Sequence, residues 1–249
     1  MAVDEALTEG FLKTRRPVLR FYGWKPAGFS LGYSQKTEEV LDVDLCRENN
    51  VPFVRRVTGG SLIYHNQEVT YSLVCSPEDL AKHLTVKEGF KKLCWFILNM
   101  YSELGLNSCF ACEYAWRNNS STSSFCFSSF EDYDILIEGR KIGGNAQKRK
   151  KGLIFQHGSI PLTLDLDSAK KYVKEDLRGI ENRAVSLDMV LFRKTGFEEI
   201  SKRLKSSFEK VFNLSLKESC LSAEEERRAG YLESEKYRKD SWNISRVNQ

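Results

Sequence analysis

The sequence predicts an α+β fold, because segments with helical periodicity and segments with strand-like character follow one another in blocks. Along the 249 residues the order is helix, strands, helix, strands and helices, whereas a parallel doubly wound sheet would alternate strand and helix regularly. No internal repeat or low-complexity linker divides the chain. We therefore expect one domain over residues 1–249, with residues 188–249 as a mainly helical C-terminal part.

The N-terminal segment is predicted to be a helix followed by short strands. Val3, Leu7 and Phe11 recur four residues apart, so residues 2–13 carry one apolar stripe. The next stretch, "VLRFYGWKPAGFSLGYSQ", is rich in aromatic and β-forming residues and is broken by glycine and proline. Such a pattern is typical of short strands joined by turns.

The middle of the chain is predicted to contain two helices with strands between them. A short helix over residues 42–49 precedes three strand-like runs, "PFVRRV", "SLIYH" and "EVTYSLVCS". The clearest helix covers residues 86–106, where seven apolar side chains share one face and Gly105 provides a stop.

The second half continues with strands and ends in helices. Residues 133–138 alternate before a turn at Gly139, and "KIGGNAQ" and "GLIFQHGSIPL" complete an antiparallel set. After them, three segments have helical periodicity, at residues 167–176, 195–212 and 222–239.

Composition excludes several classes of protein. Hydrophobic residues make up 41% and charged residues 29%, as in a globular protein, and no apolar run has the roughly 20 residues that cross a bilayer. The net charge of +4 is mild for a nucleic-acid-binding protein, so we expect neither nucleic acid nor membrane as partner. The local basic run at residues 148–151 is either a solvated turn or a docking site for an acidic partner.

The seven cysteines favour a reducing compartment, and we expect the protein to be cytoplasmic. Only Cys109 and Cys112 have the spacing of metal ligands, and no second pair accompanies them. No metal site is therefore predicted, and packing is the interpretation we favour for these two thiols.

A glycine pair stands in the segment "RRVTGGSLIYHNQEVTYS", at Gly59 and Gly60. Two glycines after a strand let a ligand approach the backbone closely, and their N–H groups can hold an anion or a carbonyl. A tight hairpin turn explains the pair equally well. His65, at the end of a strand in the same segment, is more typical of a hydrogen-bonded structural residue.

Cys126 is the cysteine in the polar, serine-rich stretch "SSFCFSSF". A reactive thiol needs exposed, electropositive surroundings, because the thiolate is the nucleophile. Lys141 provides a positive charge if the strands bring it near, and its ammonium group can also stabilise the oxyanion of acyl transfer. The residues alone leave open a structural role for Cys126.

Joint occurrence of these motifs points to one family. "RRVTGGSLIYHNQEVTYS" followed by "GRKIGGNAQKRKKGLIFQHGSI" resembles the lipoate-protein ligase and octanoyltransferase family, relatives of the biotin protein ligases. The likeness covers residues 1–187, and "CF" upstream of "YDILIEGRKIGGNAQKR" looks most like the LipM-type octanoyltransferases. The resemblance implies a mixed, largely antiparallel sheet, a smaller sheet and flanking helices.

The resemblance also implies roles for individual residues. Cys126 would be the nucleophile and Lys141 the group that contacts the acyl carbonyl. The substrate pocket would be lined by Arg56, Gly59, Gly60, Ser61, His65, Gly143, Gly144, Asn145, Ala146, His157 and Gly158. Ser61 and Asn145 depart from the residues that are usual there, and the family commonly has a strand before the first helix of this sequence.

The function implied by the resemblance is octanoyl transfer in lipoate biosynthesis. The donor would be octanoyl-acyl carrier protein, and the acceptor a lysine of a lipoyl domain or of a glycine cleavage H-type protein. A cysteine thioester would carry the octanoyl group, and no cofactor is expected because the donor thioester is already activated. Three alternatives remain: a lipoyl amidotransferase that works between lipoyl domains, an ATP-dependent lipoate-protein ligase, and a non-catalytic relative that binds acyl groups.

Overall fold

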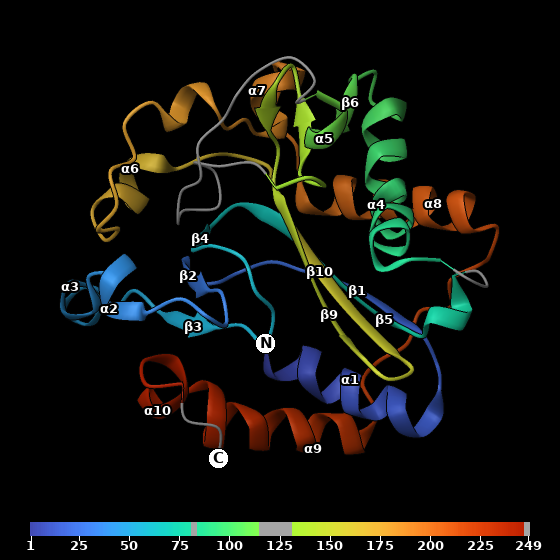
Figure 1. The fold of residues 1–249 in the computed structure, drawn as a ribbon, viewed down its shortest axis with the longest axis horizontal. Helices are drawn as coiled ribbons and strands as arrows, with labels where there is room; N and C mark the ends of the chain where they lie inside the picture. The colour runs from blue at the N-terminus through green and yellow to red at the C-terminus, as the bar shows by residue number, and fades with distance from the viewer. Residues whose placement is uncertain (81–83, 115–130, 247–249) are drawn as a thin grey trace.

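The computed structural model describes residues 1–80, 84–114 and 131–246, and a twisted central sheet occupies its middle (Figure 1). Within these residues the sheet has four strands in the order β1-β5-β10-β9, every neighbouring pair antiparallel. The strands are β1 (Val18–Tyr22), β5 (Glu68–Cys75), β9 (Gly144–Lys150) and β10 (Leu153–Pro161).

Two smaller sheets flank the central one in the described part of the chain. The first has the order β3-β2-β4, with β2 parallel to β3 and antiparallel to β4, and the second is an antiparallel sheet in the order β6-β7-β8. Their strands are β2 (Gly28–Leu31), β3 (Phe53–Arg55), β4 (Ile63–His65), β6 (Ser108–Phe110), β7 (Ile135–Ile137) and β8 (Arg140–Lys141). The predicted α+β class is confirmed, and the structure divides the smaller sheet into two.

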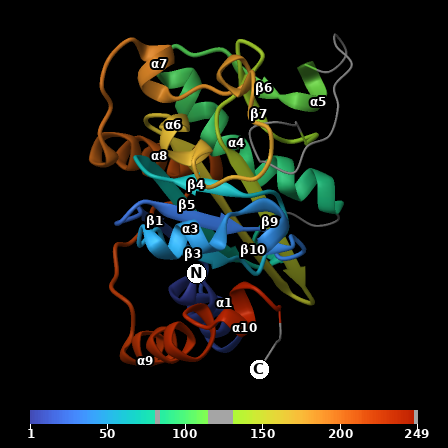
Figure 2. The same ribbon diagram turned by 90° about the vertical axis from the view of Figure 1, so that its left-hand side faces the viewer.

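Helices cover both faces of the central sheet (Figures 1 and 2). Helices α4 and α8 pack on one face, and α1 packs on the other with α9 beneath it. The helices are α1 (Ala2–Thr14), α2 (Thr37–Val40), α3 (Val43–Glu48), α4 (Val86–Glu103), α5 (Ala111–Tyr114), α6 (Leu166–Lys170), α7 (Leu187–Leu191), α8 (Phe197–Phe212), α9 (Ala223–Leu232) and α10 (Asp240–Asn243), with 3-10 turns at Pro77–Asp79 and Ile180–Asn182 and a π-helical turn at Glu233–Tyr237. Among the described residues, none of these helices combines the length and apolarity needed to cross a membrane.

Local signals set the limits of the longest helix, α4. The Thr85 hydroxyl accepts a hydrogen bond from the Glu88 N–H, and the Glu88 carboxylate accepts one from the Thr85 N–H, which is a capping box. The predicted span of 86–106 is slightly too long at its C-terminal end. The helix ends at Glu103 because Gly105 takes a φ of +78°, in the left-handed region that favours glycine.

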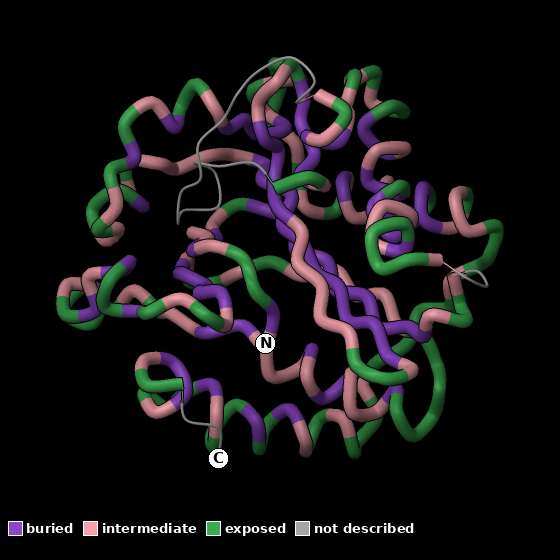
Figure 3. Tube along the Cα trace, in the orientation of Figure 1, coloured by how far each residue is buried: buried purple, intermediate pink, exposed green. Residues whose placement is uncertain are grey.

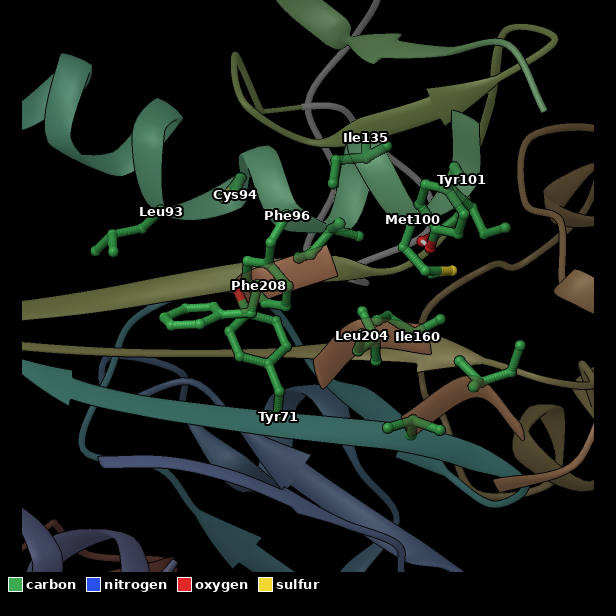
Figure 4. Packing of buried hydrophobic residues seen from close by; sticks show 14 of the residues in the cluster. Tyr71, Leu93, Cys94, Phe96, Met100, Tyr101, Ile135, Ile160, Leu204 and Phe208 are labelled. Carbon is green, nitrogen blue, oxygen red and sulfur yellow. Dashed lines mark hydrogen bonds between the residues drawn. The ribbon is translucent and has the colours of Figure 1, made fainter. Parts of the chain in front are cut away.

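The main core lies between the central sheet and the α4–α8 pair. Tyr71 from β5 meets Phe96 from α4 edge to face with ring centroids 5.2 Å apart, and Phe96 meets Phe208 from α8 at the same distance (Figure 4). The two middle strands of the central sheet, β5 and β10, are buried along their whole length (Figure 3). This core holds the middle of the sheet rigid beneath the pocket described below.

The predicted helix at residues 222–239 is observed as α9 followed by the π-helical turn, and α10 begins after its predicted end. Helix α9 packs along α1, where Arg228 binds Glu9 at 2.6 Å. Lys236 in the π-helical turn binds Glu5 at 2.7 Å. The C-terminal segment therefore returns to the N-terminal helix and reaches the β3-β2-β4 sheet through α10.

Candidate functional site

A small pocket opens where the central sheet meets the β3-β2-β4 sheet. Nine of the residues expected from the sequence line it: Arg56, Gly60, Ser61, His65, Gly144, Asn145, Ala146, His157 and Gly158. Five lining residues were not expected: Met1, Trp24, Ile63, Thr70 and Ser159. Motifs more than 80 residues apart in the sequence thus meet at one cavity.

Four expected residues lie outside the lining. Gly59 and Gly143 are adjacent in sequence to lining residues but do not line the pocket themselves. Lys141 is buried and precedes Gly143 by two positions. Cys126 lies outside the described residues. Lys141 precedes Gly144 by three positions, so their Cα atoms lie within about 11 Å of each other.

Two glycines are required by close backbone packing. Gly143 has a φ of +101°, and a Cβ there would lie 2.0 Å from the Ser159 carbonyl oxygen. A Cβ on Gly158 would lie 2.2 Å from Asn145 Oδ1, which accepts a 2.7 Å hydrogen bond from the Tyr71 hydroxyl. These glycines therefore allow β9 and β10 to pack closely along one wall of the pocket.

Arg56 shapes the opposite wall. One of its Nη atoms donates to the Ser30 carbonyl at 2.7 Å and to Ser30 Oγ at 2.8 Å. The other Nη atom donates to the carbonyls of Gly59 at 3.1 Å and Ser61 at 2.9 Å. The guanidinium group thus fixes the turn that carries Gly60, whose φ of +93° is accessible to glycine.

A buried chain of hydrogen bonds positions His65. Its Nδ1 lies 2.8 Å from Glu68 Oε1 and its Nε2 lies 2.5 Å from Ser30 Oγ. With Nδ1–H donating to the carboxylate, Nε2 accepts from the Ser30 hydroxyl when the ring is neutral and donates to Ser30 Oγ when the ring is charged. Trp24 stacks on the imidazole with centroids 3.9 Å apart and planes at 9°. His65 therefore combines the expected structural bonding with a place in the pocket wall.

Glu68 joins three elements around the pocket. Besides His65, it accepts hydrogen bonds from Ser159 Oγ at 2.7 Å and from the Thr70 hydroxyl. Burial raises the pKa of this carboxyl group, but the charge and hydrogen bond of His65 and the two hydroxyl donors outweigh it. The pKa of Glu68 is consequently below its usual value, and the group is a carboxylate at neutral pH.

His157 lies on the other side of the cavity and is neutral. Its Nε2 is 2.7 Å from the Thr58 hydroxyl. Burial lowers the pKa of His157 to about 3, and the positive charge of Arg56 acts in the same direction. The imidazole therefore serves as a hydrogen-bonding wall residue at neutral pH and not as a proton donor.

Lys141 forms a buried ion pair with Asp134. Nζ of the lysine donates to Asp134 Oδ2, and the two side chains are 2% and 5% exposed. Burial raises the pKa of Asp134, and the neighbouring ammonium group of Lys141 opposes that rise without cancelling it. The backbone N–H of Glu131 also donates to Asp134 Oδ2 at 2.8 Å. The ion pair thus keeps the Lys141 ammonium group inside the protein, in the strand that precedes β9.

The sequence contains signals for some residues that the sequence analysis missed. Leu136 pairs with Lys141 across the β7–β8 hairpin, so Asp134, two positions earlier, is the diagonal neighbour of the lysine. Likewise, His65 and Glu68 flank a two-residue connection between strands β4 and β5. Ser30 and Trp24 come from distant segments and have no comparable local signal.

The described cysteines other than Cys220 show no sign of activation. Burial raises the thiol pKa of Cys46 to about 11 and of Cys75 to about 12, and it also raises the pKa of Cys94, Cys109 and Cys112. A raised pKa disfavours the thiolate that a nucleophile or metal ligand requires. Within the described ranges, no cluster of three histidine, cysteine or acidic side chains could hold a metal ion.

Comparison with solved structures gives the fold a close counterpart. A lipoate protein ligase from T. acidophilum with bound lipoic acid superposes with a TM-score of 0.80 at 25% identity, covering 98% of this chain and 92% of that one. Lipoate-protein ligase A bound with ATP gives a TM-score of 0.81 at 24% identity, covering 99% of this chain and 93% of that one. The predicted arrangement of sheets and helices is thereby confirmed.

Comparison of sequences identifies the family. The octanoyltransferases LipM of Bacillus subtilis and Geobacillus kaustophilus are 37% and 38% identical to this chain, over 99% of its length and 93% of theirs. A family model, the lipoyl protein ligase A/B catalytic domain, matches residues 1–209. The chain therefore belongs to the lipoyl protein ligase A/B family, as its glycine, lysine and histidine motifs predicted.

Proposed function

We propose that the protein is an octanoyltransferase of lipoate biosynthesis, which moves an octanoyl group from acyl carrier protein to a lysine of a lipoyl domain. The observation that carries this proposal is the similarity to octanoyltransferases over 99% of the chain. The geometry is compatible with it, because the buried Lys141 precedes the pocket residue Gly144 by only three positions.

The proposed reaction has two steps and needs no nucleotide. The Cys126 thiolate attacks the carbonyl carbon of the octanoyl thioester, a new thioester forms on Cys126, and the phosphopantetheine thiol of the carrier leaves with a proton. The neutral amine of the acceptor lysine then attacks this thioester, which forms an amide and returns the Cys126 thiol. The second step runs downhill because an amide is more stable than a thioester.

Lys141 is assigned to the acyl carbonyl in both steps. Its charge suits the oxyanion of each tetrahedral intermediate, and a preorganised cation in a buried place stabilises such an intermediate more strongly than one in water. Asp134 holds the ammonium group in position. Asp134 is therefore proposed as a positioning residue that acts through Lys141.

The pocket walls suit an acyl group next to a polar thioester. Trp24, Ile63 and Ala146 present apolar surface, whereas His65 and His157 lie on its polar sides with their nitrogens bound within the protein. A mainly apolar wall with a few placed polar groups is typical of a small-molecule site.

The basic run at residues 148–151 is proposed as the docking site of an acidic carrier protein. Residues of one strand face the same side at every second position, so Lys148 and Lys150 continue the face of β9 that carries the pocket residue Ala146. Arg149 points elsewhere, since its Nη2 donates to the Val86 carbonyl at 3.3 Å. Docking would depend on Lys148 and Lys150.

We further propose that residues 1–249 act as one catalytic unit, in the cytoplasm. Contacts of α9 with α1 and of α10 with β3 support the first part. All six cysteines in the described ranges are free thiols, which supports a reducing compartment. The acceptor in this proposal is a lipoyl domain or a glycine cleavage H-type protein.

Mass spectrometry of the intact protein tests the chemistry. After incubation with octanoyl-acyl carrier protein, we expect one octanoyl mass on a peptide that contains Cys126. Cys126→Ser should lose both this adduct and octanoyl transfer, whereas Cys220→Ser, at an exposed cysteine, should keep both. Full transfer activity of the Cys126→Ser protein would refute the cysteine mechanism.

The choice of donor separates the proposal from its alternatives. Three reactions are compared: octanoyl-acyl carrier protein, an octanoylated lipoyl domain, and octanoate with ATP. We expect the first to be used best and without ATP. Preference for the octanoylated domain would indicate an amidotransferase, an ATP requirement would indicate a ligase, and tight carrier binding without an adduct would indicate a non-catalytic relative.

A further inference from the structure

Arg55, the first of the two adjacent arginines, does not line the pocket but forms an extensive hydrogen-bond network of its own. Its side chain is fully buried at the end of β3, and burial lowers its pKa to about 10. No carboxylate pairs with it among the described residues. Instead its guanidinium group donates to the carbonyls of Gly32, Tyr33, Gln35, Trp242, Asn243 and Ile244 and to the Thr37 hydroxyl, at 2.6 to 3.5 Å.

The acceptors come from two separate segments, and the first is the C-terminal one. Trp242 and Asn243 belong to α10, which lies against β3 (Figure 1). The indole N–H of Trp242 donates to the Arg55 carbonyl at 2.9 Å, and Asn243 Oδ1 accepts from the Arg55 N–H at 2.9 Å. Helix α10 therefore binds both the backbone and the side chain of Arg55, and we call residues 237–244 the C-terminal clasp.

The second group of acceptors lies on the loop after β2, directly behind the pocket. A Cβ added to Gly32 would lie 1.7 Å from the Gly60 carbonyl oxygen, so the two backbones are in close contact. The N–H of Tyr33 donates to the Thr58 carbonyl at 2.8 Å. Gly60 lines the pocket, and Thr58 holds His157. A shift of residues 32–35 would therefore move the pocket wall.

We propose that the C-terminal clasp positions the wall of the substrate pocket through Arg55. The clasp lies beyond residues 1–209, the part matched by the catalytic family, yet it supplies three of the carbonyls that a buried guanidinium group needs. Without them, buried donors would remain unsatisfied, which is costly, and the loop at residues 32–35 would rearrange to satisfy them. Arg55 is thus a positioning residue, and Arg56 next to it fixes the wall directly.

Hydrogen exchange on the full chain tests this coupling independently of any reaction. Trp242→Ala removes a side chain that is 2% exposed and is expected to displace α10. We expect amides of residues 57–62 to exchange at least about fivefold faster, with α4 unchanged on the opposite side of the sheet. Arg238→Ala, in the same segment but with a side chain 74% exposed, is the matched control and should leave residues 57–62 unchanged.

A milder variant covers the case in which Trp242→Ala does not fold. Trp242→Phe keeps an aromatic ring beside Tyr33 and Tyr237 but removes the indole donor to the Arg55 carbonyl. It should give a smaller increase in exchange at the same residues. Faster exchange in the clasp, in either variant, with no change at residues 57–62 would overturn the proposal.

The kinetic consequence rests on the proposed function of the pocket. If the pocket binds the acyl end of the donor, Trp242→Ala should raise the KM for octanoyl-acyl carrier protein by about tenfold and change kcat by less than about twofold. The KM of the Trp242→Phe protein should lie closer to the wild-type value than to that of Trp242→Ala. Faster exchange at residues 57–62 with an unchanged KM would support the coupling and would instead overturn the assignment of the pocket to the donor.

Discussion

Asp134 and Lys141 are diagonal neighbours at the β7–β8 hairpin and form a buried ion pair. The lysine is one of the two residues to which the family resemblance assigns the chemistry, and the aspartate is the group that holds it. Removing one partner of such a pair leaves the other charge buried without compensation.

Asp134→Asn should therefore lower both stability and activity. We expect a loss of about 3–5 kcal/mol in the free energy of unfolding, measured with urea, because the Lys141 ammonium group loses its carboxylate. Acylation by octanoyl-acyl carrier protein should slow at least about tenfold at a protein concentration and temperature where the variant is folded. Asp132→Asn, at an exposed neighbouring carboxylate, is the control. An unchanged acylation rate would remove Asp134 from the site.

His157 should make the fold sensitive to mild acid. Its pKa is about 3 in the folded protein, whereas the unfolded chain binds a proton near pH 6.5. As the pH falls from 6.5 towards 3, the unfolded state gains a proton that the folded state does not, so stability is present above pH 6.5 and is progressively lost below it. Between pH 7 and pH 5 the loss is roughly 2 kcal/mol.

Urea unfolding of wild type and His157→Gln at these two pH values measures this contribution. The variant cannot gain the proton, so its stability should fall by about 2 kcal/mol less over the same interval. Equal pH dependence of the two proteins would show that His157 is not the group responsible.

The two glycines next to the pocket lining, Gly59 and Gly143, differ in the substitutions that they tolerate. Gly143→Ala should destabilise the protein by at least about 2–3 kcal/mol, since its φ is +101° and the new Cβ would meet the Ser159 carbonyl oxygen. Gly59→Ala has no atom within 4 Å of the new Cβ among the described residues, and its cost should stay below about 1 kcal/mol. Thermal unfolding compares the pair, and equal shifts would contradict the packing argument.

The β9 lysines should govern the rate at which the donor binds. We expect Lys148→Glu with Lys150→Glu to lower the association rate of octanoyl-acyl carrier protein about tenfold at low salt, and the difference should shrink as salt is added. Lys202→Glu with Lys217→Glu changes the net charge equally at two exposed positions outside β9. If both double variants bind the donor alike, the effect is one of net charge and not of a docking site.

Much of the fold could be predicted because its signals are local. The apolar stripe of α4 and its capping box lie within one segment, and so do the β-branched residues of β7. The π-helical turn after α9 could not be predicted, because it depends on Lys236 binding Glu5 more than 230 positions away. Periodicity alone made that region appear as one helix.

The site residues also divide into those that local sequence signals predict and those that only the folded chain reveals. Glycine and histidine motifs indicated most of the pocket, since they mark close backbone approach and family resemblance. Trp24 and Ser30 were missed because only the folded chain brings them to His65. Arg55 was overlooked beside Arg56 because the partners that define its role stand near the far end of the chain.

The close packing at Gly158 limits how the substrate specificity of this enzyme can change. Any larger residue there would collide with Asn145 and Tyr71, so that wall is closed to gradual variation. Trp24 is held by its stacking on His65 and by a 2.9 Å hydrogen bond to Thr70, so Ile63 and Ala146 are the apolar lining residues with fewer such constraints. We expect evolution or engineering towards shorter or longer fatty acids to begin at these two positions.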